Sequence, residues 1–229
     1  MTTLVKVARY HLVDRVPYIY RPIGALAFIF AVCLVIYGII QPPINGSHVG
    51  AVASIYIMFG VLGAISVSQS MPFAFALGVS RRTFLWGTLL LMAVMALLYG
   101  VGLTLLQEAE RATGGWDLHL TFFRVPFILN GSWYETLATS FVGLVLLFVW
   151  GLWFGLVYRR WSVTGMVIFI ALQITAAVLA ALVITWTHAW NGFGHFFTQL
   201  SAMGLTGVLA GLAALLVLGG MATMRRVTV

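Results

Sequence analysis

Residues 163–186 read VTGMVIFIALQITAAVLAALVITW and contain no Asp, Glu, Lys or Arg. A helix rises 1.5 Å per residue, so about 20 residues cross the ~30 Å hydrocarbon core of a bilayer. This run of 24 residues is longer than that minimum and shows no polar face. It therefore predicts a helix that spans a membrane.

Five further uncharged runs of similar length occur in the chain, at 22–40, 49–68, 84–106, 137–158 and 200–221. Residues 41–47, QPPINGS, separate the first two runs and cannot continue a helix. Together the six runs predict an all-α polytopic membrane protein with six transmembrane helices, forming a single transmembrane domain over residues 1–229.

The composition excludes a soluble globular enzyme. Hydrophobic residues make up 62% of the 229 residues and charged residues only 7%, and the mean hydropathy is +1.06. Soluble domains contain about 25% charged residues. The single cysteine, Cys33, lies inside an apolar run, which excludes a disulfide within the chain and a thiolate metal cluster.

The basic residues predict the orientation, because cytoplasmic loops of membrane proteins carry an excess of Lys and Arg. With a cytoplasmic N-terminus, the outer side holds only Arg111 and Arg124. The inner side then holds the other ten basic residues: Lys6, Arg9, Arg15, Arg21, Arg81, Arg82, Arg159, Arg160, Arg225 and Arg226. We therefore expect a multi-pass protein of the cell membrane with both termini cytoplasmic. Its net charge of +7 then favours anionic lipid rather than nucleic acid.

Residues 1–21 predict an amphipathic helix that lies in the inner membrane interface. Apolar side chains recur on one side of this helix at ~100° per residue, namely Leu4, Val5, Ala8, Leu12 and Val16. Arg15 interrupts that side. An ordinary basic leader segment is the alternative interpretation.

The six runs contain no ionisable acid or base, although such groups mark most proton relays and ion paths in membranes. The chain also has no GxxxxGK[ST] sequence, the phosphate-binding loop of many ATPases. We therefore expect a protein that is not an enzyme and has no metal or cofactor of its own. Energy for any driven process would come from a partner.

Two glycine pairs at a spacing of four residues allow helices to approach closely. They are Gly151 with Gly155 and Gly207 with Gly211. Such pairs serve either packing within one chain or a seam between two copies, and the sequence leaves both interpretations open.

Residues 69–84, QSMPFAFALGVSRRTF, connect the second and third runs on the predicted inner side. Ser70 is suited to cap the N-terminus of a short helix, Pro72 to its first turn and Gly78 to its end. Ser80 is suited to cap the helix that follows. The segment therefore predicts a short helix across the cytoplasmic face.

This short helix carries the apolar residues Phe73, Phe75 and Leu77. Arg81 and Arg82 come at the start of the next helix, where the helix dipole disfavours cations. Lipid phosphates or an acidic protein surface would compensate. The two interpretations are a docking site for a partner protein and a plain positive-inside anchor.

Residues 75–84, FALGVSRRTF, resemble the loop after the second span of type-2 ATP-binding-cassette (ABC) permeases. The basic N-terminal segment, the six spans, the inner termini and the short apolar segment 187–199 also resemble that family, which folds the last segment as re-entrant helices. The chain differs from the family at Gln69, where many members carry an acidic residue, and in its 30-residue outer connection 107–136.

The resemblance implies that the short loop helix docks into a separate ATPase subunit, which binds ATP and magnesium. It also implies a second permease subunit, either identical or similar. The first hypothesis is thus the membrane subunit of an ABC exporter that moves an amphipathic drug, lipid or peptide outward. The alternatives are a non-transporting scaffold or accessory subunit, and a secondary transporter or small intramembrane enzyme.

Overall fold

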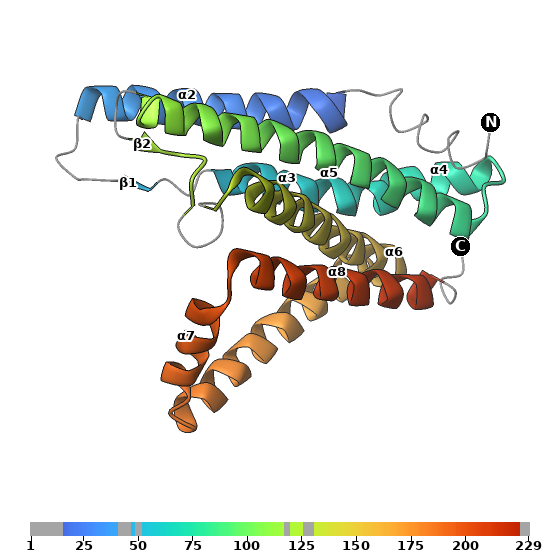
Figure 1. Cartoon of the computed structure of the whole chain (residues 1–229). Helices are drawn as coiled ribbons and strands as arrows, with labels where there is room; N and C mark the ends of the chain where they lie inside the picture. Colours follow the sequence, from blue (N-terminus) through green and yellow to red (C-terminus); the bar gives the residue numbers. More distant parts are fainter. Residues whose placement is uncertain (1–15, 41–46, 49–51, 117–119, 126–130, 225–229) are drawn as a thin grey trace.

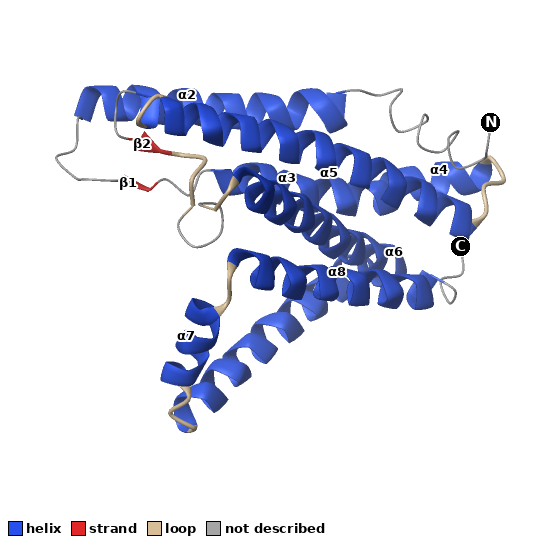
Figure 2. Ribbon diagram, viewed as in Figure 1, coloured by secondary structure: helices blue, strands red, loops and turns tan. Residues whose placement is uncertain are grey.

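The computed structural model describes residues 16–40, 47–48, 52–116, 120–125 and 131–224. The chain folds into helices, and the strands of this described part are one pair of two residues each (Figure 2). The elements follow in the order η1 (Val16–Tyr20), α2 (Arg21–Ile40), β1 (Ser47–His48), α3 (Ala53–Ile65), η3 (Ser66–Ser70), α4 (Met71–Ala76), α5 (Arg81–Ala112), β2 (Leu120–Thr121), α6 (Trp133–Trp186), α7 (Trp190–Gln199) and α8 (Ala202–Met224). The predicted all-α class is confirmed, whereas most of the predicted interfacial helix 1–21 lies outside the described residues.

Five helices in the described part of the chain have the length and composition needed to cross a membrane. Their bounds are Tyr18–Ile39, Ala53–Ala76, Arg81–Ala112, Trp133–Trp186 and Ala202–Met221. Four of the six uncharged runs correspond to one helix each. The other two runs, 137–158 and 163–186, both lie in the fourth helix, Trp133–Trp186.

Helix α6 has 54 residues, which as one straight rod would be about 81 Å long. It is broken at Ser162, whose backbone angles are φ 56° and ψ −151°. We call residues 133–161 the first arm and residues 163–186 the second arm. Figure 1 shows the second arm, in orange, turning back from the first arm, in olive. The break lies two residues after the predicted tight connection at Arg159 and Arg160.

The backbone at Ser162 is strained, because its angles fall in a region that is essentially restricted to glycine. Three residues later, Gly165 allows the chain to reverse. A Cβ atom at Gly165 would lie only 2.2 Å from the Cβ of Trp161. The reversal between the two arms therefore depends on a strained serine and on a glycine without a side chain.

Helix α3 and the first arm are in direct backbone contact through three glycines. A Cβ atom added to Gly63 would lie 2.0 Å from the carbonyl oxygen of Phe148, and one added to Gly151 would lie 1.8 Å from that of Gly60. Helices in a bilayer associate through close packing, since lipid tails are as apolar as leucine. These glycines therefore join α3 and the first arm into one unit.

Helix α8 lies along the other side of the first arm. The hydroxyls of Thr139 and Thr206 are 2.7 Å apart and buried, and the indole Nε1 of Trp153 donates to the carbonyl oxygen of Leu216 at 3.0 Å. These contacts join the two helices near both of their ends, and they leave the second arm almost wholly exposed.

Successive long helices run in alternating directions (Figure 1). Helix α4, the break at Ser162 and the C-terminal end of α8 lie at one end of the molecule, which we call the α4 end. The paired strands β1 and β2, the start of α6 and helix α7 lie at the opposite end, which we call the strand end.

Helix α2 is shifted along its own axis, toward the strand end, relative to α5 (Figure 1). The hydroxyl of Tyr99 donates to the carbonyl oxygens of Tyr18 at 3.0 Å and Ile19 at 3.2 Å. Tyr99 lies about 27 Å along α5 from Arg81 at 1.5 Å per residue. Arg21, the first residue of α2, therefore lies level with the middle of α5, and α2 extends past the other helices at the strand end (Figure 1).

Candidate functional site

Helix α4 continues directly from α3 and η3. The prediction that Ser70 caps the start of a separate short helix is therefore wrong. Ser70 has helical backbone angles, and its side chain makes no capping hydrogen bond. A helix that is already running needs no cap, because the preceding turns supply acceptors for its amides. Pro72 lies in the first turn of α4, as predicted.

The end of α4 is built as the sequence predicts. Gly78 has a φ of 77°, a left-handed conformation that favours glycine, and the amide of Val79 donates back to the carbonyl oxygen of Ala74 at 3.1 Å. Ser80 is extended, and its hydroxyl oxygen accepts the amide of Thr83 at 3.2 Å. Ser80 thereby caps α5 and fixes where Arg81 begins the next helix.

The three apolar side chains of this segment do not point the same way. Phe73 and Leu77 are exposed, at 50% and 65% of their surfaces, and they lie one helical turn apart. Phe75 is half-buried, and its ring packs 6.1 Å from that of Phe84. The guanidinium of Arg81 lies 6.0 Å from the same Phe75 ring. Phe75, which the sequence grouped with Phe73 and Leu77 as a docking candidate, therefore packs partly inside the chain.

We call Phe73 and Leu77 the α4 patch. Arg82, in the first turn of α5, is also exposed, and so is Trp86 one turn further along. The α4 end of the molecule thus presents apolar side chains on α4 beside a cationic side chain at the start of α5.

The two glycine pairs have different surroundings. Gly155, like Gly151, packs inside the chain, where a Cβ atom would lie 2.7 Å from the carbonyl oxygen of Ala64. This pair is therefore not accessible to a second copy. Gly207 and Gly211 on α8 have nothing within 4 Å of the position of a Cβ atom, so their face of α8 is open.

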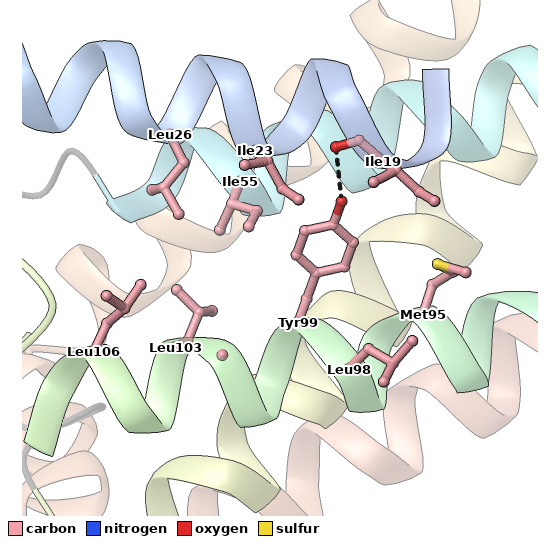
Figure 3. Close-up of a pocket in the computed structure, with 10 residues that line it drawn as sticks. Ile19, Ile23, Leu26, Ile55, Met95, Leu98, Tyr99, Leu103 and Leu106 are labelled. Carbon is pink, nitrogen blue, oxygen red and sulfur yellow. Dashed lines mark hydrogen bonds between the residues drawn. The ribbon is translucent and has the colours of Figure 1, made fainter. Parts of the chain in front are cut away.

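An apolar groove of about 330 Å³ lies between η1–α2 and α5 (Figure 3). Its floor includes Ile55 and Leu103, which are buried, and its edges are Ile23 and Leu98, which are at least half exposed. The residues that line it are Ile19, Ile23, Leu26, Ile55, Met95, Leu98, Tyr99, Gly102, Leu103 and Leu106. Figure 3 shows the Tyr99 side chain crossing this space to reach the carbonyl of Ile19.

An aromatic cluster with a buried carboxylate lies beyond the groove at the strand end. Glu110 is only 1% exposed, and its Oε2 accepts the amides of Phe122 at 2.9 Å and Phe123 at 2.8 Å. The rings of Phe30 and Trp116 pack against these phenylalanines with centroid distances of 5.1 to 6.4 Å. Glu110 thus holds the turn after β2 against the end of α5.

The sequence did not single out Tyr99, Gly102 or Glu110. The uncharged run ends at Leu106, so the residues after it were assigned to an outer loop, whereas α5 continues to Ala112. The sequence does contain one indication that α5 continues past Leu106. Leu103, Leu106 and Glu110 recur at helical spacing and extend one face of α5 beyond the run.

Within the described residues, no group of three or more His, Cys, Asp or Glu side chains could hold a metal ion. No family model matches the chain, and no curated protein or solved structure does so either. The features that indicate a function are therefore the groove, the α4 patch and the way in which α3, α4 and α6 are joined.

Proposed function

We propose that the chain is the membrane-spanning permease subunit of a type-2 ABC exporter. In this proposal α2, α3, α5, the two arms of α6 and α8 are six spans, and the α4 end faces the cytoplasm. Both termini are then cytoplasmic, and the protein is a multi-pass protein of the cell membrane. The alternating direction of the long helices supports this arrangement (Figure 1). The basic bias of the sequence supports it too, except for Arg21, which lies level with the middle of α5.

The observation that carries the proposal is the geometry of α4. Phe73 and Leu77 are exposed side by side on a short helix at the end of the molecule. Apolar side chains grouped in this way mark an interaction site. The Gly78 turn and the Ser80 cap hold the helix in one orientation. We assign the α4 patch, together with Arg81 and Arg82, as the surface that binds a separate ATPase subunit.

The joined helices explain how ATPase closure would act on the membrane domain. Residues Ala53–Ala76 form one continuous helical element of 24 residues, so a push on α4 moves α3 as well. Because Gly63 and Gly151 hold α3 in backbone contact with the first arm, the push passes to the first arm. The break at Ser162 leaves the second arm free to respond separately.

The partners follow from this assignment. ATP and magnesium bind to the ATPase subunits, and this chain needs no cofactor. A second permease subunit, identical or similar, completes the pathway, and the open face of α8 at Gly207 and Gly211 is a candidate for that contact. The exported molecule is amphipathic.

The test is affinity purification of the chain from its native membranes in the presence of ATP. We expect an ATPase with a Walker A sequence to co-purify with the wild-type protein. Truncating a buried apolar anchor often costs ~2 kcal/mol or more. The double variant Phe73→Ala/Leu77→Ala should therefore lose at least ~30-fold in docking affinity.

Phe28→Ala is the matched control, because Phe28 is equally exposed but lies on α2, away from α4. Equal recovery of the ATPase with the double variant and with Phe28→Ala would refute docking through α4. A chain that purifies without any ATPase would instead favour a scaffold or accessory subunit.

A further inference from the structure

The groove between α2 and α5 is lined almost entirely by apolar groups. Nine of the ten lining residues are aliphatic or glycine, and the hydroxyl of Tyr99 already donates to the carbonyls of Tyr18 and Ile19. From Met95 to Leu106 the lining of α5 extends about 16 Å at 1.5 Å per residue. A long and almost entirely apolar space suits a single alkyl chain that passes beside the Tyr99 ring.

The groove is open both inside and at its mouth. A Cβ atom at Gly102 would meet nothing within 4 Å, although Gly102 lines the groove. Ile23 and Leu98 form exposed edges on the two helices. A chain can thus enter sideways from the surrounding bilayer.

The polar end of the site lies one helical turn beyond the groove on both helices. Phe30 follows Leu26 by four residues on α2, and Glu110 follows Leu106 by four residues on α5, so each pair shares one helix face. Leu26 and Leu106 are the two groove residues at the strand end (Figure 3). The aromatic cluster and Glu110 therefore lie next to the groove, along the same two helix faces.

Beside the aromatic rings, two buried polar atoms of opposite type lack a hydrogen-bond partner among the described residues. Within the described part of the chain, Glu110 Oε1 and Trp116 Nε1 make no hydrogen bond. Glu110 also has no ion-pair partner there, since the neighbouring Arg111 pairs with Glu108 at 3.0 Å. Buried polar atoms are nearly always paired, and a buried charge needs a compensating one.

We propose that the groove and this polar end form a binding site for a single-chain cationic amphiphile with an amino-alcohol head. The alkyl chain lies along α5 from Leu106 toward Met95. The ammonium donates to Glu110 Oε1 and supplies the missing positive charge, and the aromatic rings around it favour a cation. The hydroxyl oxygen accepts the indole N–H of Trp116.

The head enters by separating the rings of Phe30 and Trp116, the two half-buried members of the cluster, and Trp116 stays within reach of the head. Binding does not depend on the proposed function. That the bound molecule is also the exported one rests on the proposed function.

The experiment measures binding of radiolabelled 2-aminododecan-1-ol to the purified full-length chain in nanodiscs of phosphatidylcholine, with empty nanodiscs subtracted. We expect saturable binding of one molecule per chain. Glu110→Gln removes the charge but keeps an oxygen for the amides of Phe122 and Phe123. It should weaken binding at least ~10-fold, which is about 1.4 kcal/mol. Glu108→Gln changes a partly exposed carboxylate two residues away, which pairs with Arg111. This control variant should bind 2-aminododecan-1-ol with an affinity within about twofold of the wild type.

A second pair of variants tests the groove. Gly102→Leu fills the space that the chain would occupy, and it should weaken binding of 2-aminododecan-1-ol and of the neutral dodecan-1-ol alike. Gly38→Leu, at an equally open position on α2 outside the groove, should weaken neither. Glu110→Gln should leave dodecan-1-ol binding unchanged, because that probe has no charge. Thermal unfolding of every variant tests whether it is folded. If Gly102→Leu does not fold, Gly102→Ala takes its place.

Binding of 2-aminododecan-1-ol that is unaffected by Glu110→Gln, or unaffected by filling the groove, would overturn the proposal. Competition by phosphatidylethanolamine in the nanodisc would show that a lipid head occupies the site, and would overturn the assignment to a free amphiphile. No ATPase is present in this binding assay. Absence of amphiphile binding would therefore not contradict the proposed docking of an ATPase, and absence of ATPase docking would not contradict amphiphile binding.

Discussion

Replacing Gly151 by alanine adds one methyl group at the tightest point between α3 and the first arm. The new carbon would lie 1.8 Å from the carbonyl oxygen of Gly60, where an ordinary contact is at least 3.4 Å. The obstructing atom belongs to the backbone, so no side-chain rotation can relieve the clash. The two helices must therefore move apart by roughly 1.6 Å.

This separation has a predictable cost. A gap of 0.5–1 Å already forfeits a quarter to a half of the dispersion energy between facing atoms. Overpacking typically costs about 1–3 kcal/mol, and the rigid backbone on both sides puts Gly151→Ala near 3 kcal/mol on that scale. For a chain of this size each kcal/mol lowers the melting temperature by about 2–4 °C, so we expect a decrease of about 6–12 °C.

The assay is thermal unfolding of the purified protein in detergent, followed by loss of the monodisperse peak in size-exclusion chromatography. Gly38→Ala, on α2, is the matched control, because nothing lies within 4 Å of the added carbon and alanine favours a helix over glycine by up to ~1 kcal/mol. The control should keep or raise the melting temperature. Equal melting temperatures for the two variants would show that α3 and the first arm are not in backbone contact.

Three further predictions concern the α6 break, the start of α5 and the topology. Ser162→Gly should raise the stability by about 1–2 kcal/mol, measured by thermal unfolding, since glycine adopts the observed angles without strain; a loss of stability would contradict the strained geometry. Ser80→Ala should cost about 1 kcal/mol and speed amide exchange in the first turn of α5 in hydrogen–deuterium exchange, because the cap of that helix is lost; unchanged exchange would exclude the cap. In a Cys33→Ser background, Asn191→Cys should react with an impermeant thiol reagent in intact cells and Ala76→Cys should not; labelling of Ala76→Cys from outside would invert the topology.

The elements themselves could be predicted from uncharged runs, because length and lack of charge are what a membrane span requires. The local chemistry of Gly78 and Ser80 could be predicted too, since a left-handed turn and a helix cap depend on a few neighbouring residues. Ser70 shows the limit of that approach. Its cap was expected from local preference, but α3 continues through it, and no local pattern reports where a helix continues.

The directions of side chains and the relative levels of helices could not be predicted from the sequence. In a membrane helix the lipid-facing and protein-facing sides are both apolar, so hydrophobic periodicity does not mark burial. Helical spacing places Phe75 on the opposite side of α4 from Phe73, but only the structure shows that Phe75 packs against Phe84. Likewise, the level of α2 depends on the long-range hydrogen bonds from Tyr99, and the burial of Glu110 depends on a turn twelve residues away.

The most direct test of the proposed function is to photo-crosslink from the α4 patch in native membranes. A benzophenone amino acid in place of Leu77 should form an adduct with a polypeptide that contains a Walker A sequence, and the yield should change when ATP is added. The same photoreactive residue in place of Phe28, exposed on α2, should give no such adduct. Adducts from the Leu77 position with lipid alone, under conditions in which the protein is correctly inserted, would contradict the assignment of α4 as the docking helix of an ABC exporter.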